Sequence, residues 1–137
     1  CIMHKSKVLL ASDGSDTSLK AAAYASRLIK TNPQINLCVL VVAPEESGFA
    51  ELDSAMQEKG REVLDKTVQV FANEGQSIDS TLEKGDPAEV IINFAKRGKF
   101  DHIIMGSRGV SQLRGAAIGS VSHKVIHLAN CRVTLVK

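Results

Sequence analysis

Residues 105–120 form the stretch MGSRGVSQLRGAAIGS, which lies between an apolar strand pattern and an apolar helix pattern. Its glycines and final serine have the spacing G-x2-G-x9-G-S, at Gly106, Gly109, Gly119 and Ser120. Glycine lets the backbone adopt a positive φ and approach a ligand closely. A helix that opens at Ser120 would direct its first N–H groups and positive dipole end toward an anion. The stretch therefore predicts a phosphate site in a strand–loop–helix unit. The alternative is a flexible surface loop whose glycines only form turns.

The better-known phosphate motifs do not occur in this sequence. There is no G-x4-G-K-[ST], and no G-x-G-x-x-G follows the first predicted strand. Both motifs place glycines around the phosphates of a bound nucleotide. Their absence disfavours a P-loop NTPase and an ordinary dinucleotide-binding domain.

Strand and helix patterns alternate along the whole chain. Continuous apolar runs predict buried strands, and apolar residues at i, i+3, i+4 and i+7 predict helices. This alternation indicates parallel strands joined by right-handed crossovers. We predict an α/β fold with a doubly wound, five-stranded parallel sheet of order 3-2-1-4-5 and helices on both faces. The expected strands are 7–12, 37–43, 77–84, 100–105 and 132–136, and the expected helices lie between Ser15 and Asn32, Glu51 and Asn73, Asp86 and Gly98, and Ser120 and Ala129.

The helical patterns also predict which side chains face the core. The second helix is expected to bury Leu52, Met56, Val63 and Val70, and the last helix Val121, Val125 and Leu128.

The predicted strand order brings two unusual segments together. In this topology strands 1 and 4 are neighbours, and ligands bind beyond the carboxyl ends of the strands where the chain changes direction. Asp13 follows strand 1 and Gly106 follows strand 4. We therefore predict a ligand crevice between them. The alternative for Asp13, which precedes Gly14, is that it only shapes a turn.

Composition limits the classes of function. The chain has 137 residues, 44% hydrophobic and 23% charged, which fits a single domain spanning residues 1–137. Its net charge of +2 without a basic block argues against nucleic acid as a partner. The longest apolar run, residues 37–43, is far shorter than the roughly 20 residues needed to span a membrane, so no membrane partner is expected.

The N-terminus and the cysteines indicate the compartment. Residues 1–6 lack the long apolar core of a signal peptide and are expected to be a disordered tail. Cys1, Cys38 and Cys131 form no C-x-x-C and leave one cysteine over, which fits a reducing environment. We therefore predict a cytoplasmic protein, with Cys38 in the core of its strand.

The chain resembles a known family. The glycine spacing, ASDGS at residues 11–15 and the ending GSVSHKVIHLANCRVTLVK at residues 119–137 are similar to the universal stress protein family, specifically its ATP-binding branch. The resemblance extends from about Lys7 to Lys137. It implies a Rossmann-like fold of the adenine nucleotide alpha hydrolase-like type, an adenine nucleotide as ligand, dimerisation and a part in stress responses.

The resemblance also implies roles for individual residues. The triphosphate and ribose would lie against backbone N–H groups of the glycine loop, and Asp13 near the nucleoside and a Mg²⁺ ion carried by the nucleotide. The backbone of Val42, at the end of strand 2, would recognise adenine. Apart from the resemblance, Arg108 lies inside the loop and is expected to neutralise phosphate charge, with Arg114 as a weaker candidate; the alternative for both is a solvated loop cation. The full candidate set is Ala11, Ser12, Asp13, Val42, Met105, Gly106, Arg108, Gly109, Gly119, Ser120 and Val121.

The last strand offers a surface for a second copy. Val133, Leu135 and Val136 give an apolar edge strand, and an uncovered edge invites pairing. Members of the family dimerise in this way, so we expect a homodimer through residues 132–136. This sequence departs from the family at Arg132, where relatives usually carry proline.

No enzyme active site can be assembled from the sequence. His123 and His127 are an i, i+4 pair that can bind a metal, but no Cys, Asp or Glu nearby completes a set of four ligands. No histidine is placed beside a nucleophile, and no base is evident for phosphoryl transfer. We expect an ATP-binding regulatory dimer with at most slow hydrolysis. The alternatives are a nucleotide-free interaction module of the same fold and an enzyme of a related α/β nucleotide fold, for which the chain is short.

Overall fold

The computed structural model describes residues 6–107 and 119–137. Most of the predicted N-terminal tail, residues 1–5, therefore lies outside the described residues. The elements follow one another as β1 (Lys7–Ser12), α1 (Asp16–Thr31), β2 (Asn36–Ala43), α2 (Ala50–Ala72), β3 (Asp79–Lys84), α3 (Pro87–Arg97), β4 (His102–Gly106), α4 (Ser120–Leu128) and β5 (Arg132–Val136).

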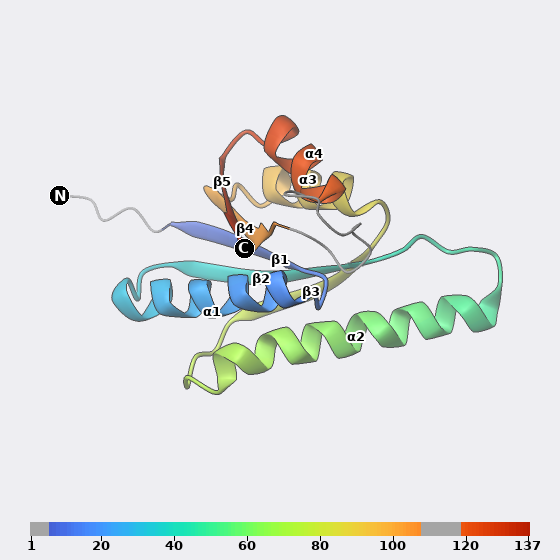
Figure 1. Cartoon of the computed structure of the whole chain (residues 1–137), viewed down its shortest axis with the longest axis horizontal. Coiled ribbons are helices and arrows are strands. Elements are labelled where there is room, and N and C mark those ends of the chain that lie inside the picture. Colours follow the sequence, from blue (N-terminus) through green and yellow to red (C-terminus); the bar gives the residue numbers. More distant parts are fainter. Residues whose placement is uncertain (1–5, 108–118) are drawn as a thin grey trace.

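The strands form one parallel sheet of order β3-β2-β1-β4-β5. Helices α1 and α2 cover one face, and α3 and α4 cover the other (Figure 1). The predicted doubly wound fold is confirmed. β3 begins later than expected, and β4 runs from His102 to Gly106 instead of from 100 to 105. Phe100 lies outside the strand, in the turn that follows α3, where its N–H donates to the carbonyl of Ala95.

Local sequence explains how the helices begin. The side chain of Ser15 accepts a hydrogen bond from the backbone N–H of Ser18 and caps α1. Asp86 accepts from the N–H of Glu89 at 3.1 Å and caps α3, which opens with Pro87. Both residues are the positions after which the sequence pattern predicts a helix.

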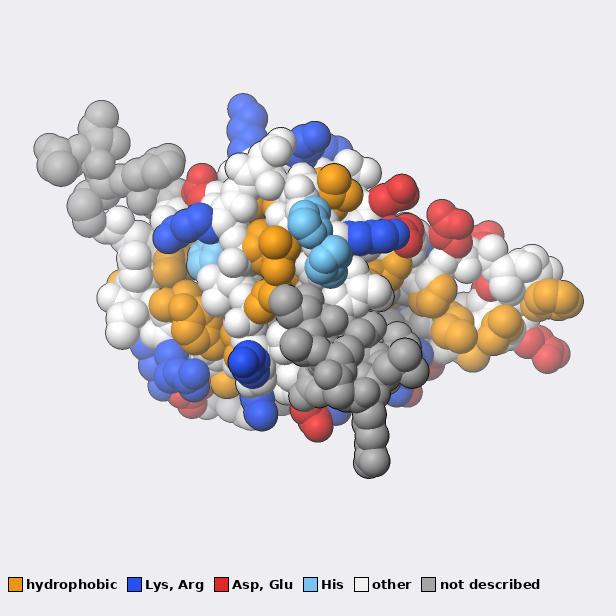
Figure 2. Space-filling view, turned by 45° about the horizontal axis from the view of Figure 1, so that its top comes forward, with side chains coloured by type: hydrophobic (Ala, Val, Ile, Leu, Met, Phe, Trp, Pro, Cys, Tyr) orange, Lys and Arg blue, Asp and Glu red, His pale blue; other side chains and the backbone are white. Residues whose placement is uncertain are grey.

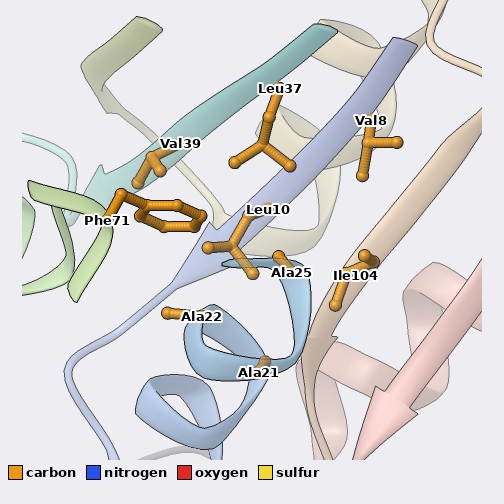
Figure 3. Packing of buried hydrophobic residues seen from close by; sticks show 9 residues of the cluster. All are labelled: Val8, Leu10, Ala21, Ala22, Ala25, Leu37, Val39, Phe71 and Ile104. Atoms are coloured by element: carbon orange, nitrogen blue, oxygen red, sulfur yellow. The ribbon is translucent and has the colours of Figure 1, made fainter. Parts of the chain in front are cut away.

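Two hydrophobic cores lie on the two faces of the sheet. In the first, alanines of α1 allow the helix to pack closely on β1, and Phe71 of α2 closes the cluster (Figure 3). In the second, α3 and α4 pack on the opposite side chains of β1, β2 and β4. The first core consists of Val8, Leu10, Ala21, Ala22, Ala25, Leu37, Val39, Phe71 and Ile104.

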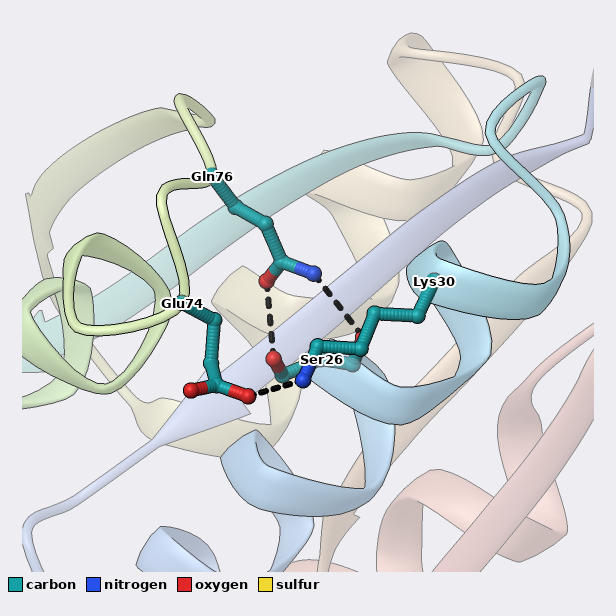
Figure 4. A network of polar contacts seen from close by, with 4 residues as sticks. All are labelled: Ser26, Lys30, Glu74 and Gln76. Carbon is teal, nitrogen blue, oxygen red and sulfur yellow. Dashed lines mark hydrogen bonds and ion pairs between the residues drawn. The ribbon is translucent and has the colours of Figure 1, made fainter.

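Polar contacts join α1 to the turn after α2. The Ser26 hydroxyl donates to Oε1 of Gln76 at 2.8 Å, and Nε2 of Gln76 donates to the Ser26 carbonyl at 3.0 Å (Figure 4). Lys30 pairs with Glu74 beside them. These contacts hold the two helices together at the end of the sheet opposite to the carboxyl end of β1.

Three predicted core positions of the helices are wrong. Leu52 and Met56 are exposed at 45% and 38%, because the first turns of α2 extend beyond the sheet (Figure 1). Leu128 is 60% exposed, since α4 turns Ser122 and Val125 inward instead. Cys38 is half-buried and so is less enclosed than expected.

Within the described ranges, none of the helices has the length and apolar character needed to cross a membrane.

Candidate functional site

A pocket of about 360 Å³ lies at the carboxyl ends of β1, β2 and β4. Strand pairing creates this site, because Ala11 is in register with both Leu40 and Met105. All predicted site residues that the structure describes line it. They are Ala11, Ser12, Asp13, Val42, Met105, Gly106, Gly119, Ser120 and Val121. The remaining candidates, Arg108 and Gly109, and the weaker candidate Arg114, lie outside the described residues.

The start of α4 forms one wall of the pocket. The N–H of Gly119 donates to the carbonyl of Ser107 at 2.5 Å, and the Ser122 hydroxyl donates to the carbonyl of Gly106 at 2.8 Å. These bonds fix the first turn of α4 against the end of β4. Whereas Ser15 and Asp86 cap α1 and α3 with their side chains, the N-cap of α4 is Gly119, which has no side chain to accept from the first N–H groups. This helix start suits an anion in the pocket.

The two described loop glycines are not explained by a positive φ, contrary to the sequence-based expectation. Gly119 has φ −72° and ψ 160°, which any residue adopts, and Gly106 is not among the positive-φ residues. A Cβ at Gly106 would lie 2.4 Å from Oγ1 of Thr17 and 2.6 Å from the backbone nitrogen of Ser18. Gly106 is therefore required because the end of β4 packs against the first turn of α1.

Asp13 shapes a turn and also lines the pocket. Its Oδ1 accepts a hydrogen bond from the N–H of Ser15 at 2.9 Å, and Gly14 between them has φ +81°. This arrangement shapes the turn from β1 into α1. Asp13 is nevertheless exposed and lines the pocket, where it is the only acidic side chain among the described residues.

Ser12 contributes a buried hydroxyl that the protein itself satisfies. Its Oγ lies 2.8 Å from Oγ1 of Thr67 and 3.3 Å from Oγ of Ser18. Because Thr67 donates its own proton to the carbonyl of Val63, the Ser12 hydroxyl donates to Thr67. The hydroxyl thus ties β1 to α2 at the base of the pocket.

The contribution of α2 and α3 was missed in the sequence analysis. Lys59 is the only basic side chain among the described lining residues. The sequence held one signal of this contact, a glycine at position 60 inside a helical pattern. The structure explains that glycine, because a Cβ at Gly60 would lie 2.9 Å from Cδ1 of Leu82. That glycine lets α2 approach the sheet beside the pocket. The lining residues added by these helices are Met56, Lys59, Gly60, Val63, Pro87 and Ile91.

His102, His123 and His127, the described histidines, lie outside the pocket lining. Nε2 of His102 is 2.6 Å from Oγ1 of Thr134, and burial together with the charge of Arg132 lowers the pKa of His102. His123 and His127 are exposed on the outer face of α4. In the parts of the chain that the structure describes, no group of three or more His, Cys, Asp or Glu side chains could hold a metal ion.

Comparison with known proteins identifies the family. The model of the universal stress protein family matches residues 5–137. The chain belongs to the universal stress protein family. It is 33% identical to universal stress protein MJ0531 of Methanocaldococcus jannaschii, over 96% of this chain and 81% of that one. It is 34% identical to universal stress protein YxiE of Bacillus subtilis, over 96% and 98% of the two chains.

Solved structures of the family share the fold. MJ0577, solved as a hypothetical protein, superposes with a TM-score of 0.86 at 27% identity, over 98% of this chain and 97% of that one. A universal stress protein in complex with cAMP has a TM-score of 0.77 at 21% identity, over 96% and 97%. The Archaeoglobus fulgidus protein in complex with dAMP has a TM-score of 0.73 at 22% identity, over 99% and 100%. These last two identities establish the common fold alone.

Proposed function

We propose that this universal stress protein binds an adenine nucleotide, ATP in the first instance, in the pocket at the carboxyl ends of β1, β2 and β4. The observation that carries the proposal is the start of α4. This helix begins at Gly119 without a side-chain cap, and its first residues line the pocket. The volume of about 360 Å³ lies within the usual range for small-molecule sites. Solved relatives of the same fold hold cAMP and dAMP, which supports the choice of ligand class.

In this proposal the phosphates lie against the first turn of α4. Backbone N–H groups and the helix dipole favour negative charge there, and Ser120 and Val121 line that wall. Arg108 and Gly109, which lie outside the described residues, stay candidates for contact with the phosphates.

The adenine would lie beside the end of β2. Pairing between β1 and β2 ends at Ser12 and Val41, whereas β2 continues through Val42 and Ala43 in register with β3. Beyond Val41, the backbone edge of β2 toward β1 is no longer part of the sheet ladder and is a site for main-chain recognition of a base. Met56 and Ile91 supply apolar surface for the ring.

Asp13 would hold a Mg²⁺ ion only together with the nucleotide. One of its carboxylate oxygens is engaged by Ser15, and no second acid lines the described pocket. Protein sites for Mg²⁺ commonly combine one or two carboxylates with substrate phosphates and water, so this donor set fits an ion brought in with ATP. Bound there, the ion would neutralise phosphate charge.

The described pocket is suited to binding more than to turnover. Its ionisable lining residues are Asp13 and Lys59, and Asp13 already shapes a turn. Fast phosphoryl transfer needs a positioned base or a residue that orients water. We therefore propose a single-domain regulatory protein with at most slow hydrolysis, in which the bound nucleotide sets the state of the protein.

A homodimer through β5 completes the proposal. Among the described strands, β5 pairs with β4 alone and ends the sheet, so its other edge has no partner strand there. The strand begins at Arg132 in register with His102, so this strand forms with arginine at the position where the family usually has proline. We place the dimer in the cytoplasm, which the free Cys38 and Cys131 support.

The test is to identify what the protein carries and binds. Mass spectrometry of small molecules released on denaturation would be followed by calorimetric titration with ATP, ADP, AMP and cAMP, each with and without Mg²⁺, and with GTP as the control for the base. Release or binding of an adenine nucleotide in preference to GTP is expected. If the protein carries no nucleotide and binds none of them, the nucleotide-free interaction module is the better account.

A further inference from the structure

The outer face of α4 carries two histidines whose rings meet. His123 and His127 are exposed, their Nε2 atoms lie 3.2 Å apart, and their ring centroids are 4.4 Å apart. Figure 2 shows adjoining histidine side chains at the surface of the molecule. Because the residues are one helical turn apart, the helix itself holds the two nitrogen atoms close together.

The separation of the two nitrogen atoms matches the distance between two ligands of one metal ion. Nitrogen ligands about 2.0–2.1 Å from a tetrahedral zinc ion lie about 3.3–3.4 Å apart, and about 2.9 Å apart at the right angle of a square-planar ion. The observed 3.2 Å falls between these values. A metal ion could therefore bind both rings with small rotations of the side chains and no change in the helix.

A hydrogen bond between the two imidazoles is the simpler explanation of the short distance. Such a bond requires one ring to donate from Nε2 and the other to accept at Nε2, so it fixes the tautomers of the pair. Both rings are exposed, and water competes for the same atoms, so the bond contributes little to stability.

We propose that His123 and His127 form a surface site for a divalent transition metal ion that favours imidazole, with Zn²⁺, Ni²⁺ and Cu²⁺ as candidates. Neutral imidazole suits these ions, whereas Mg²⁺ and Ca²⁺ prefer oxygen ligands. Because no further His, Cys, Asp or Glu joins the pair in the described residues, water fills the other coordination positions. The site is therefore open and exchanges its metal readily. It is independent of the nucleotide pocket.

The test is calorimetric titration of metal-free protein with ZnCl₂ in the absence of nucleotide. The wild type is expected to bind one Zn²⁺ ion per chain in a histidine-dependent manner. His123→Gln and His127→Gln each remove one ligand, and because loss of an outer-shell contact alone costs about tenfold or more, each should weaken binding at least that much. Lys124→Gln is the matched control on the same exposed turn and should keep the site.

A second measurement separates the site from other zinc-binding groups. Burial raises the pKa of the Cys38 and Cys131 thiols, so these thiols compete weakly for the ion. Zn²⁺ should raise the Tm of the wild type and of Lys124→Gln, but not that of His127→Gln, since the metal links two turns of α4. The proposal is overturned if both histidine variants bind Zn²⁺ as the wild type does, or if the wild type shows no histidine-dependent binding.

Discussion

The hydroxyl of Ser122 donates a 2.8 Å hydrogen bond to the carbonyl oxygen of Gly106, so the first turn of α4 is fixed to the last residue of β4. Ser122 is only 3% exposed. A second bond, from the N–H of Gly119 to the carbonyl of Ser107, joins the same two segments. The pocket therefore has a wall that is fixed independently of the loop.

Removal of this bond should weaken both the fold and the pocket. Ser122→Ala leaves the buried carbonyl of Gly106 without its side-chain donor, which is expected to cost about 1–3 kcal/mol in the free energy of unfolding. Urea unfolding measures that cost. Nucleotide affinity should also fall, because the start of α4 is less firmly placed. Lys124→Ala, at an exposed position of the same helix, should change neither quantity, and equal effects of the two variants would contradict this role of Ser122.

Lys59 should contribute electrostatically to nucleotide binding. It is the basic side chain of the described pocket, and it is exposed, so its effect is screened by salt. Lys59→Gln is expected to raise the Kd for ATP by about twofold to fivefold at low ionic strength. The difference should shrink in high salt. Lys66→Gln is the control, because Lys66 is an exposed residue of α2 that does not line the pocket. An equal effect of the two substitutions would mean that only net charge matters.

The open edge of β5 makes the proposed dimer sensitive to proline. The carbonyl of Val136 accepts from Ser107 on the β4 side, and alternate residues of a strand direct their backbone groups to opposite edges, so the N–H of Leu135 faces the open edge. Leu135→Pro removes that donor and should convert dimers to monomers, as measured by light scattering at several concentrations. Leu135→Val keeps the donor and should remain dimeric. A monomeric wild type, or a dimeric proline variant, would rule out pairing through this edge.

His102 should make stability depend on pH. Burial and Arg132 lower its pKa in the folded protein, whereas an unfolded histidine titrates near about 6.5. As the pH falls through that value, the unfolded chain takes up the proton first, so the free energy of unfolding decreases. Urea unfolding at pH 7.5 and about 5.5 should show a larger loss for the wild type than for His102→Gln. Equal losses would show that His102 does not contribute.

The fold was predictable because its signals are local and repeat along the chain. The apolar run at residues 7–12 predicted the bounds of β1, and the pattern after Asp86 predicted the start of α3; the structure has both. The period of the apolar residues predicts which face of a helix is apolar, but it does not predict where along the helix the underlying sheet ends. Leu52 and Met56 continue the apolar pattern of α2 past that point and are therefore exposed.

The site was predictable only where strand order determines it. Parallel strands end at one edge of the sheet, so Asp13 and Gly106 could be placed together without knowledge of the structure. Lys59 could not be assigned to the pocket from the sequence, because its position depends on how far α2 extends beyond the sheet. The sequence also did not show why residue 106 is glycine, since the reason is its close contact with Thr17 of α1.

The most direct test of the central claim is ATP titration of Gly119→Asp beside Gly119→Asn. The backbone of Gly119 suits any residue, and both side chains can cap α4, so both variants should fold with a Tm equal to or slightly above that of the wild type. Only aspartate adds a negative charge where the phosphates are proposed to lie, and like charges repel strongly there. We predict that Gly119→Asp weakens ATP binding by about tenfold or more relative to Gly119→Asn. Equal binding of ATP by the two variants would contradict a phosphate site at the start of α4.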